Sequence, residues 1–443
     1  MSYSNESFEA FQKKLRQEIG QDSPLWDLRD CLFAEAFYGK SGKHRSLFSF
    51  PGGWVLLLFF LWLKQRRNFS LGLIPTCAEG ASHFYFPSDR SNHIGRLLPM
   101  LENALAKGET CIAWFSAGPT SEFNGPPPEL RSFFHDVTGA WTSHLKISDF
   151  REAARLGRIL KCCLGEQINQ SQTRAACASL VQFFAWRRFW TGIFRKKPAN
   201  FVSTFEKGPI IKAASTTARA REVEPRRHGI HGLRPASLQA NRATEHWSMT
   251  PGDQRFLSTR VPDYCQVTVK ENPEAHDLAR EIGVLDFSTS SIKLPLHFLV
   301  LGPGANASYT KEMRLADLAV IKQLQDEFGT QIRFRFRPHP SRFERFRCEL
   351  LEAKIMVKDF QLRPLYEDLK WSHVVGSATS SLMLDWVHTG RKIFWIQAEL
   401  RSICAVDELV EDGIGIHLDC RHGPSRLRQA IPLLKANNPS LNL

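Results

Sequence analysis

The sequence predicts an α/β protein with two doubly wound domains, each built around a parallel sheet. Two observations carry this prediction. Short strands of the buried type alternate with amphipathic helices along two stretches of the chain, and glycine-rich turns follow several of the strands. Strand–helix–strand units of this length connect parallel strands. The 443 residues are enough for two domains of ordinary size.

The first stretch begins near residue 81. A strand over 83–86, a helix over 94–107 and a strand over 110–115 form one strand–helix–strand unit. Apolar residues recur every three or four positions along the helix, and Gly108 ends it. A weaker strand, helix and strand follow between residues 199 and 228.

The second stretch has a clearer pattern. A strand over 296–301 leads into a turn that contains Gly302 and Gly304, and a helix ends before Gly329. Three further strands are expected over 332–336, 373–375 and 392–396.

These patterns predict four regions: an N-terminal extension over 1–79, a first domain over 80–271, a linker over 272–295 and a second domain over 296–443. The extension contains ten consecutive apolar residues, 54–63. A helix that spans a bilayer needs about 20 residues. A buried core element, an interfacial membrane anchor and a spanning helix all remain open for this segment.

Composition narrows the class of protein. The formal net charge of +13 indicates an anionic partner, which could be nucleic acid, an acidic membrane surface or a phosphorylated substrate. The ten cysteines show neither a C-x-x-C pair nor zinc-binding spacing. Scattered cysteines are typical of reduced thiols, and the N-terminus lacks the pattern of a signal peptide. We therefore expect a cytoplasmic protein without a metal or cofactor.

A second segment suits a membrane surface. Residues 181–197 are dense in aromatic residues and arginines. Such a helix can lie on an anionic bilayer with its rings in the interface. The alternative is a helix that packs on the sheet and has a basic C-terminal end.

Alternation along residues 331–340 (QIRFRFRPHP) places three arginines on one face of a strand. Ligands of open α/β sheets bind at the carboxyl ends of strands, where Arg337 and His339 would lie. Those two residues would form an anion pocket. Alternatively, this is an edge strand, or the arginines lie over a helix and reach solvent.

A Gly/Ser/Thr turn between a strand and a helix occupies residues 374–386. The first N–H groups of a helix suit phosphate, and Thr379, Ser380 and Ser381 add hydroxyl groups. Asp385 would face a ribose or favour the helix N-terminus. The alternative is N-capping of the helix by a serine or threonine.

Two histidines follow a strand of the first domain, in the segment Arg226–Gly232. His228 or His231 could act as a general base on an acceptor hydroxyl, because the pKa of histidine lies near neutral pH. The alternative is a turn with exposed histidines. Gly302 and Gly304 could bring backbone close to a phosphate.

Taken in order, these segments resemble bacterial surface-polysaccharide transferases of the GT-B fold. This group includes capsule 3-deoxy-octulosonate transferases, polysialyltransferases and CDP-glycerol glycerophosphotransferases. The resemblance rests on the histidine–glycine pairs at 228–232, followed by Trp247 and Gly252, and on Arg337–Pro340 and Ser380–Trp386. Departures are Arg227, where many relatives have Gln, and the acidic pair before Gly413, which lies near the C-terminus rather than in the first domain.

The resemblance implies two Rossmann-like domains that face a cleft. His339, Ser380 and Ser381 would bind the phosphate of a CMP- or CDP-linked donor, and His228 or His231 would be the base. The acceptor would be a surface polysaccharide or a lipid-linked glycan at the inner membrane face, and no metal is implied. Alternatives are an epimerase or hydrolase on the same fold and a non-catalytic binding protein. Nucleic acid is not expected, since the recognised binding modules are missing from the sequence.

Overall fold

The structure is a computed structural model of the chain. It describes residues 5–19, 26, 28, 79–86, 91–115, 128–137, 139–165, 170–196, 198–203, 208–220, 225–228, 243–270, 273–285, 292–303, 309–339, 342–399 and 406–434. The apolar segment 54–63, His231 and Gly304 lie outside the described residues. So do the side chains of His228, Ser381 and Asp385.

Contacts within the chain divide it into two compact units. Unit 1 comprises Met1–Gly229, Pro235–Trp247 and Arg260–Thr268. Unit 2 comprises Ile230–Arg234, Ser248–Thr259 and Val269–Leu443. The predicted linker, residues 272–295, includes helix α10 (Pro273–Ile282), which belongs to unit 2.

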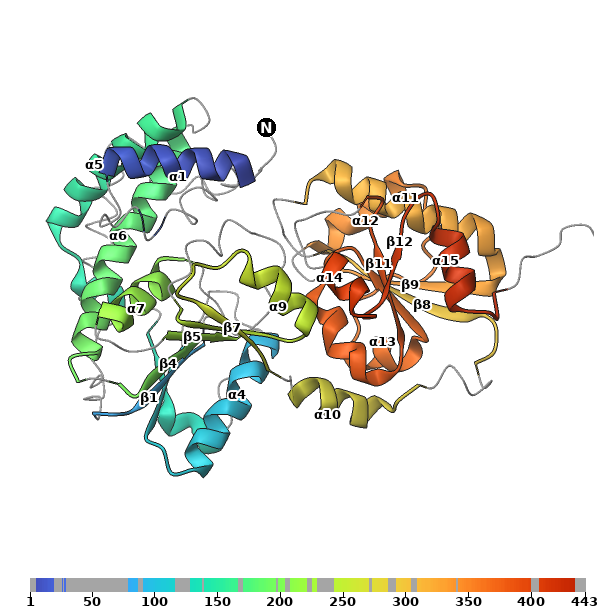
Figure 1. The fold of residues 1–443 in the computed structure, drawn as a ribbon, viewed down its shortest axis with the longest axis horizontal. Coiled ribbons are helices and arrows are strands. Elements are labelled where there is room, and N and C mark those ends of the chain that lie inside the picture. The colour runs from blue at the N-terminus through green and yellow to red at the C-terminus, as the bar shows by residue number, and fades with distance from the viewer. Residues whose placement is uncertain are drawn as a thin grey trace, which may run out of the picture. The chain divides into compact units, whose positions relative to one another are not determined.

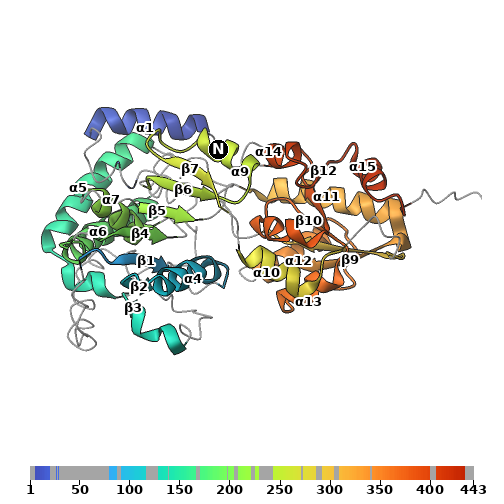
Figure 2. The same ribbon diagram turned by 60° about the horizontal axis from the view of Figure 1, so that its bottom comes forward.

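Unit 1 is built on a seven-stranded sheet of order β3-β2-β1-β4-β5-β6-β7 (Figures 1 and 2). Neighbouring strands from β3 to β6 pair in parallel. The strands are β1 (Ser82–Phe86), β2 (Cys111–Phe115), β3 (Phe134–Asp136), β4 (Asn200–Ser203), β5 (Pro225–His228), β6 (Glu245–Ser248) and β7 (Gln266–Val269). The helices are α1 (Asn5–Ile19), α4 (Ser91–Ala106), α5 (Ile147–Leu164), α6 (Gln170–Ile193) and α7 (Pro209–Ala220), with short 3-10 turns η2 (Pro128–Phe133) and η3 (Ala140–His144).

Side chains of β1 alternate between two cores on opposite faces of this sheet. Phe84 and Phe86 pack with α4, whereas Tyr85 packs with α6. Both faces of the strand are therefore covered by helices, as a doubly wound sheet requires. The first six strands have the order typical of a Rossmann fold.

Unit 2 is built on a five-stranded sheet of order β12-β11-β10-β8-β9, with parallel pairing throughout (Figure 1). The strands are β8 (Leu296–Leu301), β9 (Ile332–Arg337), β10 (Val374–Ser377), β11 (Lys392–Ile396) and β12 (Ile416–Leu418). The helices besides α10 are α9 (Pro251–Ser258), α11 (Lys311–Phe328), α12 (Phe343–Glu352), α13 (Leu365–Trp371), α14 (Val406–Glu411) and α15 (Gly423–Ala430), with 3-10 helices η5 (Gly329–Gln331) and η7 (Ser381–Thr389).

Helices cover both faces of the five-stranded sheet, with α11 and α15 on one side and α10 and α13 on the other (Figure 1). The strand order is that of a flavodoxin-like sheet, in which the chain reverses direction between its first and third strands, here β8 and β10. The two sheets confirm the predicted fold class of two Rossmann-like, doubly wound α/β domains.

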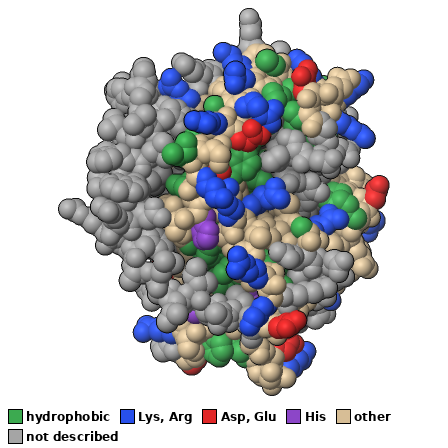
Figure 3. Space-filling model, turned by 90° about the vertical axis from the view of Figure 1, so that its left-hand side faces the viewer, with side chains coloured by type: hydrophobic (Ala, Val, Ile, Leu, Met, Phe, Trp, Pro, Cys, Tyr) green, Lys and Arg blue, Asp and Glu red, His purple; other side chains and the backbone are tan. Residues whose placement is uncertain are grey.

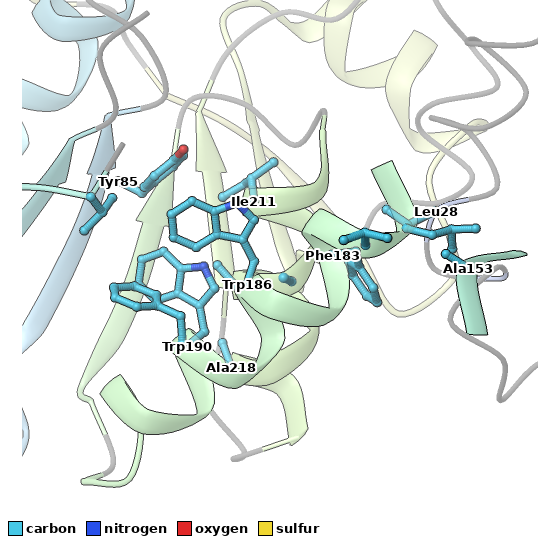
Figure 4. Packing of buried hydrophobic residues seen from close by; sticks show 14 of the residues in the cluster. Leu28, Tyr85, Ala153, Phe183, Trp186, Trp190, Ile211 and Ala218 are labelled. Carbon is cyan, nitrogen blue, oxygen red and sulfur yellow. The ribbon is translucent and has the colours of Figure 1, made fainter. Parts of the chain in front are cut away.

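The aromatic helix α6 packs inside unit 1. Trp186, Phe189, Trp190 and Phe194 are at most 4% exposed, and Trp190 lies among Tyr85, Trp114 and Phe201 (Figure 4). The expectation that these rings lie in a bilayer interface is therefore wrong for the structure, because the sheet, α5 and α7 bury them. The alternative, a helix packed on the sheet, is confirmed. None of the described helices is long and apolar enough to cross a membrane.

Candidate functional site

The carboxyl ends of β8, β9 and β10 are tied together by hydrogen bonds. The Gly302 amide donates to the Arg337 carbonyl (2.8 Å), and the Ser377 hydroxyl donates to the Leu301 carbonyl (3.3 Å). The turns that carry Gly302, Arg337 and the Ser377–Ser380 segment therefore meet at one edge of the sheet, at the point where the strand order reverses. Three of the predicted site segments are brought together there.

The turn after β10 is organised by Ser377, which is buried. Its hydroxyl accepts long hydrogen bonds from the amides of Thr379 (3.4 Å) and Ser380 (3.2 Å). Ser380 is the N-cap residue of η7, but its side chain makes no capping hydrogen bond in the described structure. Ser377 therefore shapes the turn before η7 rather than capping the helix, and the half-buried Thr379 and Ser380 follow it at the sheet edge.

The arginines of β9 have the predicted alternation, but acidic side chains lie opposite two of them. Arg335 pairs with Asp359 (3.0 Å) and with Asp368 (3.1 Å) and lies over the Trp371 ring. Arg337 donates to the same Asp368 (2.6 Å) and to the Arg363 carbonyl (2.5 Å).

Asp368 is fully buried, on helix α13. β9 is an edge strand, as the alternative interpretation expected, and Arg335 lies over a helix. Arg337 reaches the site edge with its charge already balanced in part by Asp368.

A small pocket of about 30 Å³ lies at the same edge, between the strand ends and the helices α11 and α12. Its apolar wall includes Val300, Leu318, Ile321 and Phe346. Its polar wall is formed by these side chains: Tyr309, Arg314, Asp317, Glu349 and Ser377. The sequence analysis predicted the turn that contains Ser377 as part of the site. It did not predict the other four polar residues.

Three guanidinium groups converge on one carboxylate oxygen in the wall of this pocket. Glu349 Oε1 lies 2.8 Å from Arg314, 3.0 Å from Arg342 and 3.4 Å from Arg345. Arg314, Arg342 and Glu349 are all buried. Burial and the neighbouring Arg314 charge lower the pKa of Arg342. The wall therefore brings several cations to a single anion.

Asp317 connects the pocket to the end of β11. It accepts hydrogen bonds from the Tyr309 hydroxyl and from the Ala398 amide (2.8 Å). Gln397 donates from its side chain to the Ala378 carbonyl (2.7 Å), which ties the β11 end to the β10 turn.

A pattern in the sequence could have indicated part of this network. Arg314 and Asp317 are charged residues three positions apart, on the same side of α11 as buried Leu318 and Ile321.

Of the other predicted site residues, His228 lies in unit 1, whereas His339, Ser381 and Asp385 follow strands of unit 2. His228 ends β5 of unit 1, in register with Trp247. His339 follows β9 and is half-buried. Ser381 and Asp385 lie on η7. Among the described residues, no group of three or more His, Cys, Asp or Glu side chains could hold a metal ion.

The Gly252 and Glu411–Gly413 segments have structural contacts. Gly252 on α9 lies so close to α14 that an added Cβ would approach the Glu408 carbonyl oxygen to 2.6 Å. Arg255 on the same helix pairs with Asp412 (2.8 Å). The acidic pair before Gly413 therefore takes part in packing α9 against α14.

No protein-family model and no curated protein matches the chain. Solved structures that resemble it include the UDP-GlcNAc 2-epimerase of Methanocaldococcus jannaschii (12% identity, 82% of this chain and 96% of that one, TM-score 0.46). The UDP-GlcNAc 2-epimerase of Neisseria meningitidis bound to UDP-GlcNAc is 11% identical (81% and 95%, TM-score 0.48). A glycosyltransferase from Rickettsia africae ESF-5 is 9% identical (80% and 88%, TM-score 0.42). These likenesses are too distant to assign an activity or a site residue.

Proposed function

We propose that the carboxyl edge of the five-stranded sheet binds the phosphate of a nucleotide donor and that the chain is a nucleotide-dependent transferase. The observation that supports this most is the meeting of the Gly302 and Ser377–Ser380 turns across the reversal point between β8 and β10. Open α/β sheets bind ligands in the crevice at such points.

The residues at this edge offer suitable chemistry for a phosphate. Thr379, Ser380 and Ser381 carry hydroxyl groups at the start of η7, where helical N–H groups point outward. His339 follows Arg337 by two residues at the adjacent strand end. Because the Ser377 bonds to the Thr379 and Ser380 amides are long, a phosphate oxygen could compete for those amides.

The proposed donor is a CMP- or CDP-linked sugar, or a CDP-linked polyol phosphate, and the acceptor is a surface polysaccharide or a lipid-linked glycan. In sugar transfer, His228 or His231 takes the proton of an acceptor hydroxyl, and that oxygen attacks the anomeric carbon. The bond from this carbon to the donor phosphate breaks, and the nucleotide leaves with the electron pair. Hydroxyls, N–H groups and arginines would stabilise the charge on the leaving phosphate.

Thermal unfolding of the full chain with CMP, CDP, UDP, GDP and ADP tests the proposal. A ligand that binds only the folded state stabilises it by about 2.7 kcal/mol at 100 times its Kd. We expect CMP or CDP to raise the melting temperature of wild type and to have a much smaller effect on His339→Ala. His388→Ala is the matched control, because His388 is exposed at the opposite end of η7.

Three results of the thermal-unfolding experiment would change the proposal. A shift by UDP alone would keep the phosphate site but reject the cytidine donor. An equal loss of the shift in His388→Ala would reject the assignment of His339. No shift of wild type by any nucleotide would overturn the proposal and favour a chain that binds no nucleotide.

A further inference from the structure

Positive charge is distributed unevenly along the chain. Residues 146–197, which hold α5 and α6, contain 11 Lys and Arg against 3 Asp and Glu. Residues 309–434, which hold most of unit 2, contain 19 against 17. The basic surplus is therefore a local property of one helical layer of unit 1 rather than a general feature of the protein.

The structure places these cations on the outside of the layer. We define the basic face as the exposed cations of α5, α6 and the residues that flank them: Lys146, Arg151, Arg155, Arg158, Lys161, Arg187, Arg195 and Lys196. Arg151, Arg155 and Arg158 follow one another at helical spacing, so they lie on the same side of α5. Figure 3 shows Lys and Arg side chains gathered on this side of the molecule.

Acidic side chains do little to offset this charge. The described residues of α5 and α6 include two acids, Asp149 and Glu152. Asp149 is buried and accepts a hydrogen bond from Arg188, so it is not presented to a partner. Glu152 pairs with Arg155 (2.6 Å), an exposed pair that neutralises one member of the basic face. The other members of the basic face are exposed, and no described acid of α5 or α6 pairs with them.

The chemistry of the face favours an anionic lipid surface over nucleic acid. Proteins that hold single-stranded nucleic acid combine cations with exposed aromatic rings, and the rings of α6 point into the core instead. Ile147, at the start of α5, is 71% exposed beside these cations, as suits a partner with an apolar interior. In the sequence, unit 1 also carries the ten apolar residues 54–63, followed by Lys64, Arg66 and Arg67.

We propose that the basic face of α5 and α6 binds an anionic lipid surface. Each cation near such a surface adds attraction that decays within a Debye length, so binding requires anionic headgroups and weakens with salt. This role is separate from nucleotide binding, because none of the residues involved lies at the edge of the five-stranded sheet.

Vesicle co-sedimentation of the full chain tests this inference. Wild type should bind vesicles of phosphatidylcholine with phosphatidylglycerol and not vesicles of phosphatidylcholine alone, and added NaCl should release it. The variant R151Q/R155Q/R158Q/R187Q should bind the anionic vesicles roughly tenfold more weakly or worse. All four positions are exposed, so the variant should keep the melting temperature of wild type within a few degrees.

The matched control removes the same charge from unit 2. R333Q/R347Q/K358Q/K370Q changes four exposed cations and should bind anionic vesicles like wild type. Equal loss in both variants would show that net charge alone drives binding and would overturn the assignment of the basic face. Unchanged binding of the α5–α6 variant, or tighter binding of duplex DNA or RNA than of vesicles by that face, would also overturn it. The nucleotide-induced shift in melting temperature should be the same in both variants, which separates this inference from the proposed function.

Discussion

The seven-stranded sheet packs its α6 face with aromatic rings, whereas the edge strand β9 of the five-stranded sheet is held by ion pairs. In unit 1, Trp190 of α6 packs edge to face against Trp114 of β2 and Phe201 of β4. In unit 2, Arg335 and Arg337 share the buried Asp368. Aromatic packing depends mainly on burial and ring geometry, while the charge network around Asp368 fixes β9 against α13. The proposed phosphate site therefore lies in the unit whose edge strand is held in place by ion pairs.

The largest expected effect comes from breaking the aromatic core of unit 1. Trp190 is fully buried and contacts rings on three strands, β1, β2 and β4. Trp190→Ala should lower the free energy of unfolding of unit 1 by about 3–5 kcal/mol, since it removes a large side chain and leaves a cavity. Urea unfolding followed by circular dichroism would measure this. The exposed Thr191→Ala is the control, and a loss below about 1 kcal/mol in Trp190→Ala would contradict the account.

Removing the shared carboxylate should destabilise unit 2 by a comparable amount. Asp368→Ala leaves Arg335 and Arg337 without their buried partner, and breaking a buried ion pair costs about 3–5 kcal/mol. We place the effect near the lower end, because Asp359 still pairs with Arg335. The neighbouring Glu367 is exposed, so Glu367→Ala should change the urea midpoint little. If the two variants unfold alike, the charge network does not hold the edge.

A smaller effect is expected where α5 meets α6. An added Cβ on Gly157 would approach Cys177 Sγ to 2.4 Å. Gly157→Ala should therefore cost about 1–3 kcal/mol by overpacking. Cys177→Ala in the same chain should restore most of that loss by removing the sulfur. A double-mutant cycle in urea would measure this coupling, and additive effects would show that the close helix contact is unimportant.

A final effect depends on pH and belongs to unit 1. His83 is fully buried and accepts a hydrogen bond from Trp114 (2.9 Å), and burial lowers its pKa to about 4. The unfolded chain, with a histidine pKa near 6.5, binds more protons between these values. Stability should therefore rise with pH through this window and fall by up to about 1.4 kcal/mol per unit as the pH drops from 6.5 towards 4.

Comparison of wild type with His83→Gln isolates this histidine. The free energy of unfolding of the variant should decline less steeply between pH 6.5 and pH 4.5. Parallel pH profiles would show that His83 does not titrate differently in the folded and unfolded chains.

The sequence predicted strands and turns of unit 2 well because their signals are local. The strands expected over 296–301 and 392–396 match β8 and β11, and alternation placed the arginines on one face of β9. The partners of those arginines could not be predicted, because Asp368 is 31 residues away from Arg337 in the chain. The pocket wall was missed for the same reason, since Arg314 meets Glu349 over 35 residues.

For helix α6 the local sequence pattern was clear, but the environment predicted for it was wrong. Its aromatic residues cover most of the helix circumference, a pattern that fits both a bilayer interface and a fully enclosed helix. Only the surrounding sheet and helices decide between the two, and they enclose it. The exposed cations of α6 belong to the same aromatic- and arginine-rich pattern, and they remain available to a partner.

Hydrogen exchange of the full chain, with and without the nucleotide that stabilises it most, tests the phosphate site most directly. Bound phosphate should slow amide exchange in the peptides that cover 300–303, 337–339 and 377–384, while the peptides of β1 and β2 stay unchanged. Slower exchange at these three strand ends together is the result that we predict. Nucleotide binding that leaves all three unprotected would contradict the central claim.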